Sequence, residues 1–192
     1  MQLHCLRHGV THGNVEGRFN GTRDETLTDS QARALRQTPF AYADYAAIYS
    51  SPLTRCIETA RCLRIASWIP EPRLAERNLG IFEGLTADEC ARTFPDDFAT
   101  FRRFDADFVI PRGESRAQHL GRLMSWIDDV RGLDRVLAIT HGGTIDFLYR
   151  LATGRPVHGG DEIFAGANAS ISIFDVDAHG VRLVDYEMPL GL

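Results

Sequence analysis

The sequence contains no lysine; all 21 of its basic residues are arginine. A chain without lysine can form neither the Gly-Lys pair of a Walker A nucleotide-binding loop nor a Schiff base with a carbonyl substrate. Its four cysteines include no Cys-x-x-Cys pair, and none is followed by arginine at the spacing Cys-x5-Arg. These absences exclude P-loop and Schiff-base chemistry, a cysteine-phosphatase loop and a Cys-x-x-Cys redox or zinc motif.

Long apolar runs and an excess of positive charge are also missing. The longest apolar runs are only a few residues, too short to cross a bilayer, and the N-terminus lacks the apolar stretch of a signal peptide. The net charge is −5, so neither nucleic acid nor a membrane is an expected partner. We therefore expect a cytoplasmic protein whose cysteines are reduced.

What the sequence does contain is an alternation of short strands and helices over its 192 residues, which predicts one domain, residues 1–192. Strands are predicted over 2–7, 46–50 and 135–140, with a closing hairpin over 168–177 and 181–187. Helices are predicted over 29–38, 52–66, 87–93, 97–104, 114–132 and 143–153. The expected fold class is α/β, with a mainly parallel central sheet flanked by helices on both faces.

The same pattern, His-Gly-x-Thr, follows two of the predicted strands, at His8 and at His141. Because the carboxyl ends of parallel strands meet at one edge of a sheet, both imidazoles are expected to face one crevice. Arg7 precedes His8, and Arg55 is expected in the first turn of a helix that Ser51 would cap. Two imidazoles and two guanidiniums beside a helix N-terminus are typical of a site for a compact dianion such as phosphate.

A metal site is the competing interpretation of the histidines. His4, His8 and His12 recur every four residues, as ligands on one helical face would. Gly9 and Gly13 interrupt such a helix, so the pattern favours the phosphate site.

The order of these motifs resembles the histidine phosphatase superfamily, also called phosphoglycerate mutase-like. The matching residues are Arg7-His8-Gly9-Val10-Thr11, Asn14, Gly17-Arg18, Gly21, Ser50 to Arg55, Glu76, Gly80, Glu83-Gly84, Gly113-Glu114-Ser115, Arg122, Thr140 to Gly143, and Asn168 at the start of the last core strand. The resemblance runs from about residue 3 to the C-terminus. It implies a phosphoglycerate mutase-like fold with a small helical cap over the site, for which 86–113 is the candidate segment.

The resemblance also implies the roles of the residues. His8 is expected to be the nucleophile that becomes phosphohistidine, with Arg7, Arg55 and His141 around the phosphate. Glu76 is expected to be the proton donor, with Glu83 as the rival carboxylate. The expected substrate-binding residues are Arg7, Asn14, Asn20, Gly21, Arg55, Glu76, His141 and Gly142, and no metal or cofactor is expected.

Two departures from the family pattern bear on the substrate. Val10 stands where many members have glutamate, and Arg112 stands where glycine is common before Gly113-Glu114-Ser115. Both are expected near the mouth of the site, where they would affect which substrate binds.

The resemblance favours a phosphatase that hydrolyses a small phosphorylated metabolite, with α-ribazole 5'-phosphate as a candidate substrate. A phosphoglycerate mutase is the alternative within the family, and a phosphate-binding regulatory module without turnover is the alternative outside enzymes. A homodimer is a further expectation.

Overall fold

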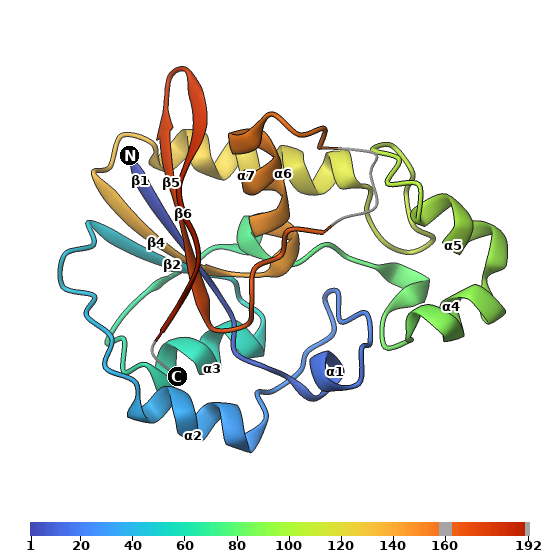
Figure 1. Ribbon diagram of the computed structural model, residues 1–192, viewed down its shortest axis with the longest axis horizontal. Coiled ribbons are helices and arrows are strands. Elements are labelled where there is room, and N and C mark those ends of the chain that lie inside the picture. The colour runs from blue at the N-terminus through green and yellow to red at the C-terminus, as the bar shows by residue number, and fades with distance from the viewer. Residues whose placement is uncertain (158–162, 191–192) are drawn as a thin grey trace.

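A six-stranded sheet forms the centre of the computed structural model, which describes residues 1–157 and 163–190 (Figure 1). The strands are β1 (Gln2–Arg7), β2 (Ala47–Ser50), β3 (Ile69–Pro70), β4 (Arg135–Thr140), β5 (Ser170–Asp177) and β6 (Gly180–Pro189). Their order across the sheet is β3-β2-β4-β1-β5-β6. The first four are mutually parallel, whereas β5 runs antiparallel to β1 and pairs with β6 as a hairpin. The predicted mainly parallel sheet and closing hairpin are confirmed.

Helices cover both faces of this sheet, as predicted (Figure 1). One face packs against α2 (Asp29–Gln37) and α3 (Thr54–Cys62) through a buried apolar cluster that includes Leu35, Ala60, Leu137 and Ile139. The other packs against α6 (Arg116–Val130) and α7 (Gly142–Thr153) through Leu123, Trp126, Ala138 and Phe147. No helix in the described part of the chain is long and apolar enough to cross a membrane.

A third apolar cluster joins the segment predicted as a cap, 86–113, to the stretch just before it, which contains Leu79 and Phe82. The segment 86–113 contains α4 (Ala87–Thr93) and α5 (Pro95–Phe101). Two short 3₁₀ helices, η1 (Pro72–Leu74) and η2 (Gly80–Phe82), precede it. Rings of Phe82, Phe98 and Phe101 pack on one another, with centroids 5.2 to 5.8 Å apart. A capping box fixes the start of α4, since the Thr86 hydroxyl accepts a bond from the Glu89 N–H and the Glu89 carboxylate accepts one from the Thr86 N–H.

The predicted start of the helix at 52 is wrong. Helix α3 begins at Thr54, and its N-cap is Leu53 rather than Ser51. The free N–H and the hydroxyl of Thr54 both donate to the carboxylate of Asp24, at 3.0 and 2.8 Å. A carboxylate from a distant loop therefore satisfies the first N–H of the helix, whereas the Ser51 hydroxyl accepts from the N–H of Leu53, at 3.3 Å, just before the helix.

The sequence patterns did not predict two short elements of the structure. Helix α1 (His12–Val15) is a single turn between the predicted strand over 2–7 and the predicted helix over 29–38. Strand β3 has only two exposed residues at the edge of the sheet, too few to show an alternation.

Candidate active site

The register of β1 against β4 brings the two histidines together. Arg7 pairs with Thr140 at the carboxyl ends of these neighbouring strands, so the next residues, His8 and His141, emerge side by side. Their ring centroids are 5.2 Å apart, and both side chains are buried. The crevice expected from the two His-Gly-x-Thr patterns is therefore formed.

His8 is held with one ring nitrogen occupied and the other free to react. Its Nδ1 lies 2.7 Å from the carbonyl oxygen of Gly9, so Nδ1 carries the proton and donates it, and Nε2 keeps a lone pair. Burial lowers the pKa of His8 well below its ordinary value, and the charges of Arg55 and Arg7 lower it further. His8 is therefore a neutral imidazole with an unprotonated Nε2 at physiological pH.

His141 is neutral for the same physical reason and has the opposite tautomer. Burial, with Arg55 next, lowers the pKa of His141 well below its ordinary value. The Nε–H of Arg55 donates to Nδ1 of His141 at 3.2 Å, which leaves the proton on Nε2, 2.7 Å from Oγ of Ser51. The hydroxyl expected to cap α3 instead fixes the orientation of this imidazole.

Arg55 is a buried guanidinium oriented by backbone carbonyls. Its two Nη atoms donate to the carbonyl oxygens of Arg23, at 2.8 Å, and Gly21, at 2.7 Å. With the bond to His141, these contacts use three of the five guanidinium N–H groups, so two remain for an anion. Gly21 has φ +51°, and a Cβ there would lie 2.2 Å from Glu83, so only glycine fits where this carbonyl is needed.

Arg7 supplies a donor that has no partner. One Nη donates to the carbonyl oxygen of Gly166, whereas Nε is buried and makes no hydrogen bond within the described residues. Burial lowers the pKa of Arg7 from its ordinary value, with a smaller opposite effect from Glu76. A buried N–H without an acceptor is rare in proteins, so this donor is available to an anion in the cavity.

Asparagines and Thr11 surround the same space. Asn14 accepts bonds from the N–H and hydroxyl of Thr11, both at 3.1 Å, and Asn20 donates to the Thr11 hydroxyl at 3.1 Å. The amide of Asn168 donates to the carbonyl oxygen of His8 at 2.9 Å and thereby fixes the backbone beside the imidazole.

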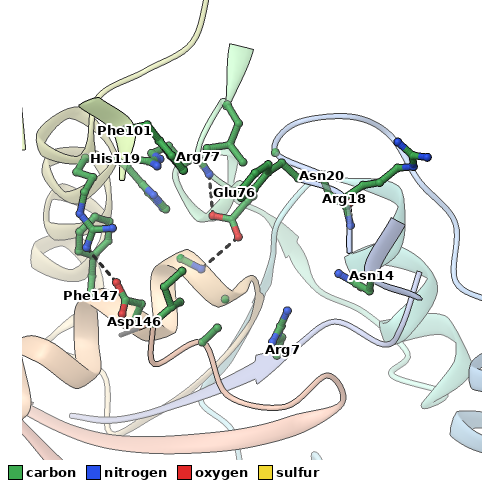
Figure 2. Close-up of a pocket in the computed structure, with 18 of the residues that line it drawn as sticks. Arg7, Asn14, Arg18, Asn20, Glu76, Arg77, Phe101, His119, Asp146 and Phe147 are labelled. Carbon is green, nitrogen blue, oxygen red and sulfur yellow. Dashed lines mark hydrogen bonds and ion pairs between the residues drawn. The ribbon is translucent and has the colours of Figure 1, made fainter. Parts of the chain in front are cut away.

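Glu76 faces the pocket with both carboxylate oxygens oriented by backbone N–H groups (Figure 2). Oε1 accepts from the N–H of Arg77 at 2.8 Å, and Oε2 accepts from the N–H of Gly143 at 3.1 Å. Glu83 instead accepts from the N–H and hydroxyl of Thr22 and from the N–H of Leu79, and so joins two loops. The geometry favours Glu76 over Glu83 as the proton donor.

These groups enclose a cavity of about 240 Å³. The expected site residues that line it are Arg7, His8, Asn14, Asn20, Gly21, Glu76 and Gly142. Arg55 and His141 lie behind this lining, bonded to one another and to the residues described above. The sequence analysis thus identified the groups around His8.

The other end of the cavity was not anticipated. It is formed by residues of the loop between η1 and η2, of α5 and the turn after it, and of α6 and α7: Arg77, Phe101, Phe104, Arg116, His119, Asp146 and Phe147. His119 lies four residues before Leu123 on the buried face of α6. A polar side chain within an apolar stripe was therefore the sequence signal that could have identified His119 as a site residue. Asp146 stands between apolar neighbours in the same way.

The two departures from the family pattern lie elsewhere. Neither Val10 nor Arg112 is among the described residues that line the cavity, so the expectation that they affect substrate binding is not supported. Arg112 has φ +62°, the left-handed conformation that glycine adopts without strain. The glycine common at this position is thus explained by the backbone.

The alternative of a metal site finds no support in the described residues, which contain no group of three metal-binding side chains. His4 instead bonds through Nδ1 to the hydroxyl of Tyr45 at 2.8 Å and through Nε2 to Gln2 at 2.9 Å.

Comparison with known proteins agrees with this geometry. The family model described as "Histidine phosphatase superfamily (branch 1)" matches residues 3–189. The chain is 32% identical to the metal-independent phosphoserine phosphatase of Arabidopsis thaliana, over 77% of this chain and 67% of that one. It is 31% identical to the glucosyl-3-phosphoglycerate phosphatase of Mycolicibacterium vanbaalenii, over 88% and 81%.

Among solved structures, the α-ribazole phosphatase of Shigella flexneri superposes with a TM-score of 0.80. The alignment covers 100% of this chain and 99% of that one at 22% identity, and it shows the shared fold. The family match over nearly the whole chain, the relatives and the paired histidines lead to one conclusion: the chain belongs to the histidine phosphatase superfamily, branch 1, and is a phosphoric monoester hydrolase.

Proposed function

We propose that this protein hydrolyses a small-molecule phosphomonoester without a metal, through a phosphohistidine formed on Nε2 of His8. One observation carries the proposal: His8 is buried and neutral, its Nδ1–H donates to Gly9, and its unprotonated Nε2 belongs to the same cavity lining as Arg7, whose buried Nε has no partner among the described residues. A neutral nucleophile next to fixed positive charge suits attack on a phosphate dianion.

In the first step, Nε2 of His8 forms a bond to phosphorus while the ester oxygen–phosphorus bond breaks. Glu76, protonated at this stage, gives its proton to the leaving oxygen and becomes a carboxylate. Arg7 and Arg55 stabilise the negative charge on the equatorial oxygens, which is the main requirement of phosphoryl transfer.

In the second step, water attacks the phosphohistidine. The Glu76 carboxylate takes a proton from that water, the new oxygen–phosphorus bond forms, and the bond to Nε2 breaks. Phosphate leaves, and both His8 and Glu76 return to their starting protonation states.

The natural substrate is proposed to be a small phosphorylated metabolite, in keeping with a cavity of about 240 Å³. α-Ribazole 5'-phosphate is a candidate, because a protein named for that activity shares the fold over its whole length. The four cysteines are free and buried, which fits the proposal of a cytoplasmic enzyme. A homodimer stays a prediction.

Phosphate release from a panel of phosphorylated metabolites and from p-nitrophenyl phosphate tests the proposal. We expect turnover that survives EDTA and is inhibited by vanadate, which adopts the five-coordinate geometry of the reacting phosphorus. His4→Ala, which removes a histidine of β1 outside the cavity, is the matched control for His8→Ala. Turnover that EDTA abolishes and a divalent cation restores would contradict the metal-independent mechanism, and no turnover of any ester would favour a regulatory module.

The mutase alternative requires a separate measurement. A mutase must keep water from its phosphohistidine so that the phosphoryl group returns to a bound intermediate. With 3-phosphoglycerate and 2,3-bisphosphoglycerate, we expect phosphate release to exceed formation of 2-phosphoglycerate. Interconversion much faster than phosphate release would replace the phosphatase with a mutase while leaving His8 as the nucleophile.

A further inference from the structure

The backbone that leads into Glu76 is held by side chains from other elements. Residues 75–79, all of which the structure describes, form no helix or strand between η1 and η2. Backbone carbonyls of such a loop need partners outside it when they are withdrawn from water. The carbonyl oxygens of four consecutive residues accept hydrogen bonds from side chains of α6 and β4: Arg73, Leu74, Ala75 and Glu76. The bond to Leu74 comes from the hydroxyl of Thr140, at 3.0 Å.

Arg122, on α6, supplies the other three bonds. One of its Nη atoms donates to the carbonyl oxygens of Arg73 and Ala75, both at 2.7 Å. The second Nη donates to the carbonyl oxygen of Glu76 at 3.1 Å. A single side chain of a helix that packs on the sheet therefore fixes the backbone of the proposed proton donor.

The rest of the Arg122 guanidinium binds the carboxylate of Glu114. The second Nη donates to Oε1 at 2.6 Å, and Nε donates to Oε2 at 3.3 Å, which makes the ion pair bidentate. All five guanidinium N–H groups are then used, and the side chains of Arg122 and Glu114 are only 22% and 20% exposed. A planar guanidinium with every donor engaged has one orientation, so Arg122 is a fixed contact rather than a mobile surface charge.

Glu114 stands directly after the segment predicted as a cap, 86–113. Its N–H donates to the carbonyl oxygen of Asn78 at 3.0 Å, and its Oε1 accepts from the N–H of Asn78 at 3.1 Å. The N–H of Ile81 donates to the carbonyl oxygen of Pro111 at 3.1 Å, so the chain that enters this segment is bonded to the chain that leaves it. The ion pair of Glu114 therefore connects the base of the segment to the proposed proton donor.

We propose that Arg122 is a positioning residue for the reaction, which places Glu76 so that its carboxylate reaches the ester oxygen. Figure 2 shows that carboxylate directed into the cavity, where two backbone N–H groups orient it. Arg122 is not among the described residues that line the cavity and has no N–H left for an anion, so it acts through Glu76. The inference rests on the proposed function, because it requires Glu76 to be the proton donor.

Two aryl phosphates that differ in their leaving group test the inference. They are phenyl phosphate and p-nitrophenyl phosphate, and phenolate, the poorer leaving group, needs the proton of Glu76 more. The value of kcat/KM covers the steps up to formation of the phosphohistidine, so the ratio of kcat/KM for the nitrophenyl ester to that for the phenyl ester measures the loss of proton donation. Misplacement of a catalytic group by about 1 Å can cost about 10²-fold, so Arg122→Met should raise this ratio by at least about tenfold.

Combination with Glu76→Gln separates positioning from a general structural effect. Glu76→Gln removes the transferable proton and should raise the ratio by itself. If Arg122 acts through Glu76, adding Arg122→Met to Glu76→Gln should raise the ratio no further. A loss of stability or of phosphate binding would lower both esters alike and would cancel in the ratio.

Arg73→Met is the matched control. The Arg73 guanidinium also joins η1 to α6, since it bonds to Glu71 at 2.8 Å and to Asp129 at 2.7 Å, but within the described chain it donates to no backbone carbonyl. Its removal should leave the ratio unchanged. Arg122→Lys keeps the positive charge with three N–H donors in place of five, so it should raise the ratio less than Arg122→Met does.

The outcomes separate the failure of this inference from the failure of the proposed function. An unchanged ratio in Arg122→Met and Arg122→Lys, or an equal rise with and without Glu76→Gln, would overturn the positioning role and leave the phosphatase standing. Should Arg122→Met not fold, the same comparison with Arg122→Lys decides the point. If the wild-type protein releases phosphate from neither ester, the proposed function itself fails.

Discussion

Neutral imidazoles beside buried guanidiniums define the site at the scale of single residues. Burial and neighbouring positive charge lower the pKa of both His8 and His141, so the proton that would block Nε2 of His8 is absent. The same positive charge stabilises a bound phosphate dianion. The groups that keep the nucleophile unprotonated are therefore those that bind its substrate.

Glu76 is the residue whose role is tested most simply. Glu76→Gln removes the transferable proton but keeps the size of the side chain. An alkoxide leaving group needs that proton and nitrophenolate hardly does, so kcat on alkyl phosphates should fall by about 10²–10⁴-fold and on p-nitrophenyl phosphate far less. Steady-state rates on the two esters check this.

Glu83→Gln is the matched control. Glu83 joins loops through Thr22 and Leu79, so its loss should lower the two rates equally and reduce stability. Equal losses on both esters in Glu76→Gln would instead show that Glu76 only positions the substrate.

At the scale of elements, the start of α7 shapes the site as much as any side chain does. Gly143, the second glycine of His141-Gly142-Gly143, donates its N–H to Oε2 of Glu76. A Cβ at this position would have no space, because it would lie 2.3 Å from Oε1 of Glu76. Gly143→Ala should therefore displace the Glu76 carboxylate. Because that carboxylate ends a movable side chain, we expect kcat on alkyl phosphates to fall while the melting temperature changes little.

Gly121→Ala provides the comparison within a helix. A Cβ at Gly121 on α6 meets no atom within 4 Å. Alanine there should leave the rates unchanged and stabilise the protein by ~0.5–1 kcal/mol through helix propensity. Unchanged alkyl phosphatase activity in Gly143→Ala would contradict the tight packing of Glu76 against α7.

Prediction of the elements from sequence succeeded where the pattern was local. The predicted bounds of α4, 87–93, and the predicted end of α7 at 153 match the structure, because the Thr86 cap and the left-handed Gly154 directly flank these helices. The start of α3 could not be predicted in this way, because its partner, Asp24, lies 30 residues earlier in the sequence. Ser51 has a residue type that commonly caps helices, but its hydroxyl bonds to the His141 imidazole and to the N–H of Leu53, one residue before α3.

At the scale of the whole molecule, three buried neutral histidines couple stability to pH. The pKa values of His8, His119 and His141 lie well below 6.5 in the folded protein, whereas an unfolded chain protonates them near 6.5. The unfolded state thus binds more protons below pH 6.5. Their contribution to stability is fully present above that pH and is lost as the pH falls toward the folded-state values, by up to ~1.4 kcal/mol per pH unit for each histidine.

Urea unfolding between pH 7 and pH 5 checks this prediction. In His119→Phe, the free energy of unfolding should fall less steeply with decreasing pH, because one of the three histidines no longer contributes to the slope. Identical slopes for wild type and His119→Phe would contradict the buried neutral imidazole.

Across the molecule, the groups around His8 could be predicted because strand ends of a parallel sheet converge and because the motifs are short. The far end of the cavity could not, because Arg77, His119 and Asp146 come from a loop and two helices whose relative placement depends on packing. His119 shows the difference: its sequence neighbours indicate a buried position, but only the fold shows that its Nε2 has no partner among the residues that the structure describes.

Trapping the phosphoenzyme tests the central claim most directly. Wild-type protein is mixed with excess p-nitrophenyl phosphate, quenched in base within the first turnovers, digested, and mapped by mass spectrometry under conditions that preserve phosphohistidine. We expect an acid-labile, base-stable phosphoryl group on the peptide that contains His8, and none in His8→Ala. Turnover that persists in His8→Ala, or a phosphoryl group found on a different residue, would contradict the mechanism.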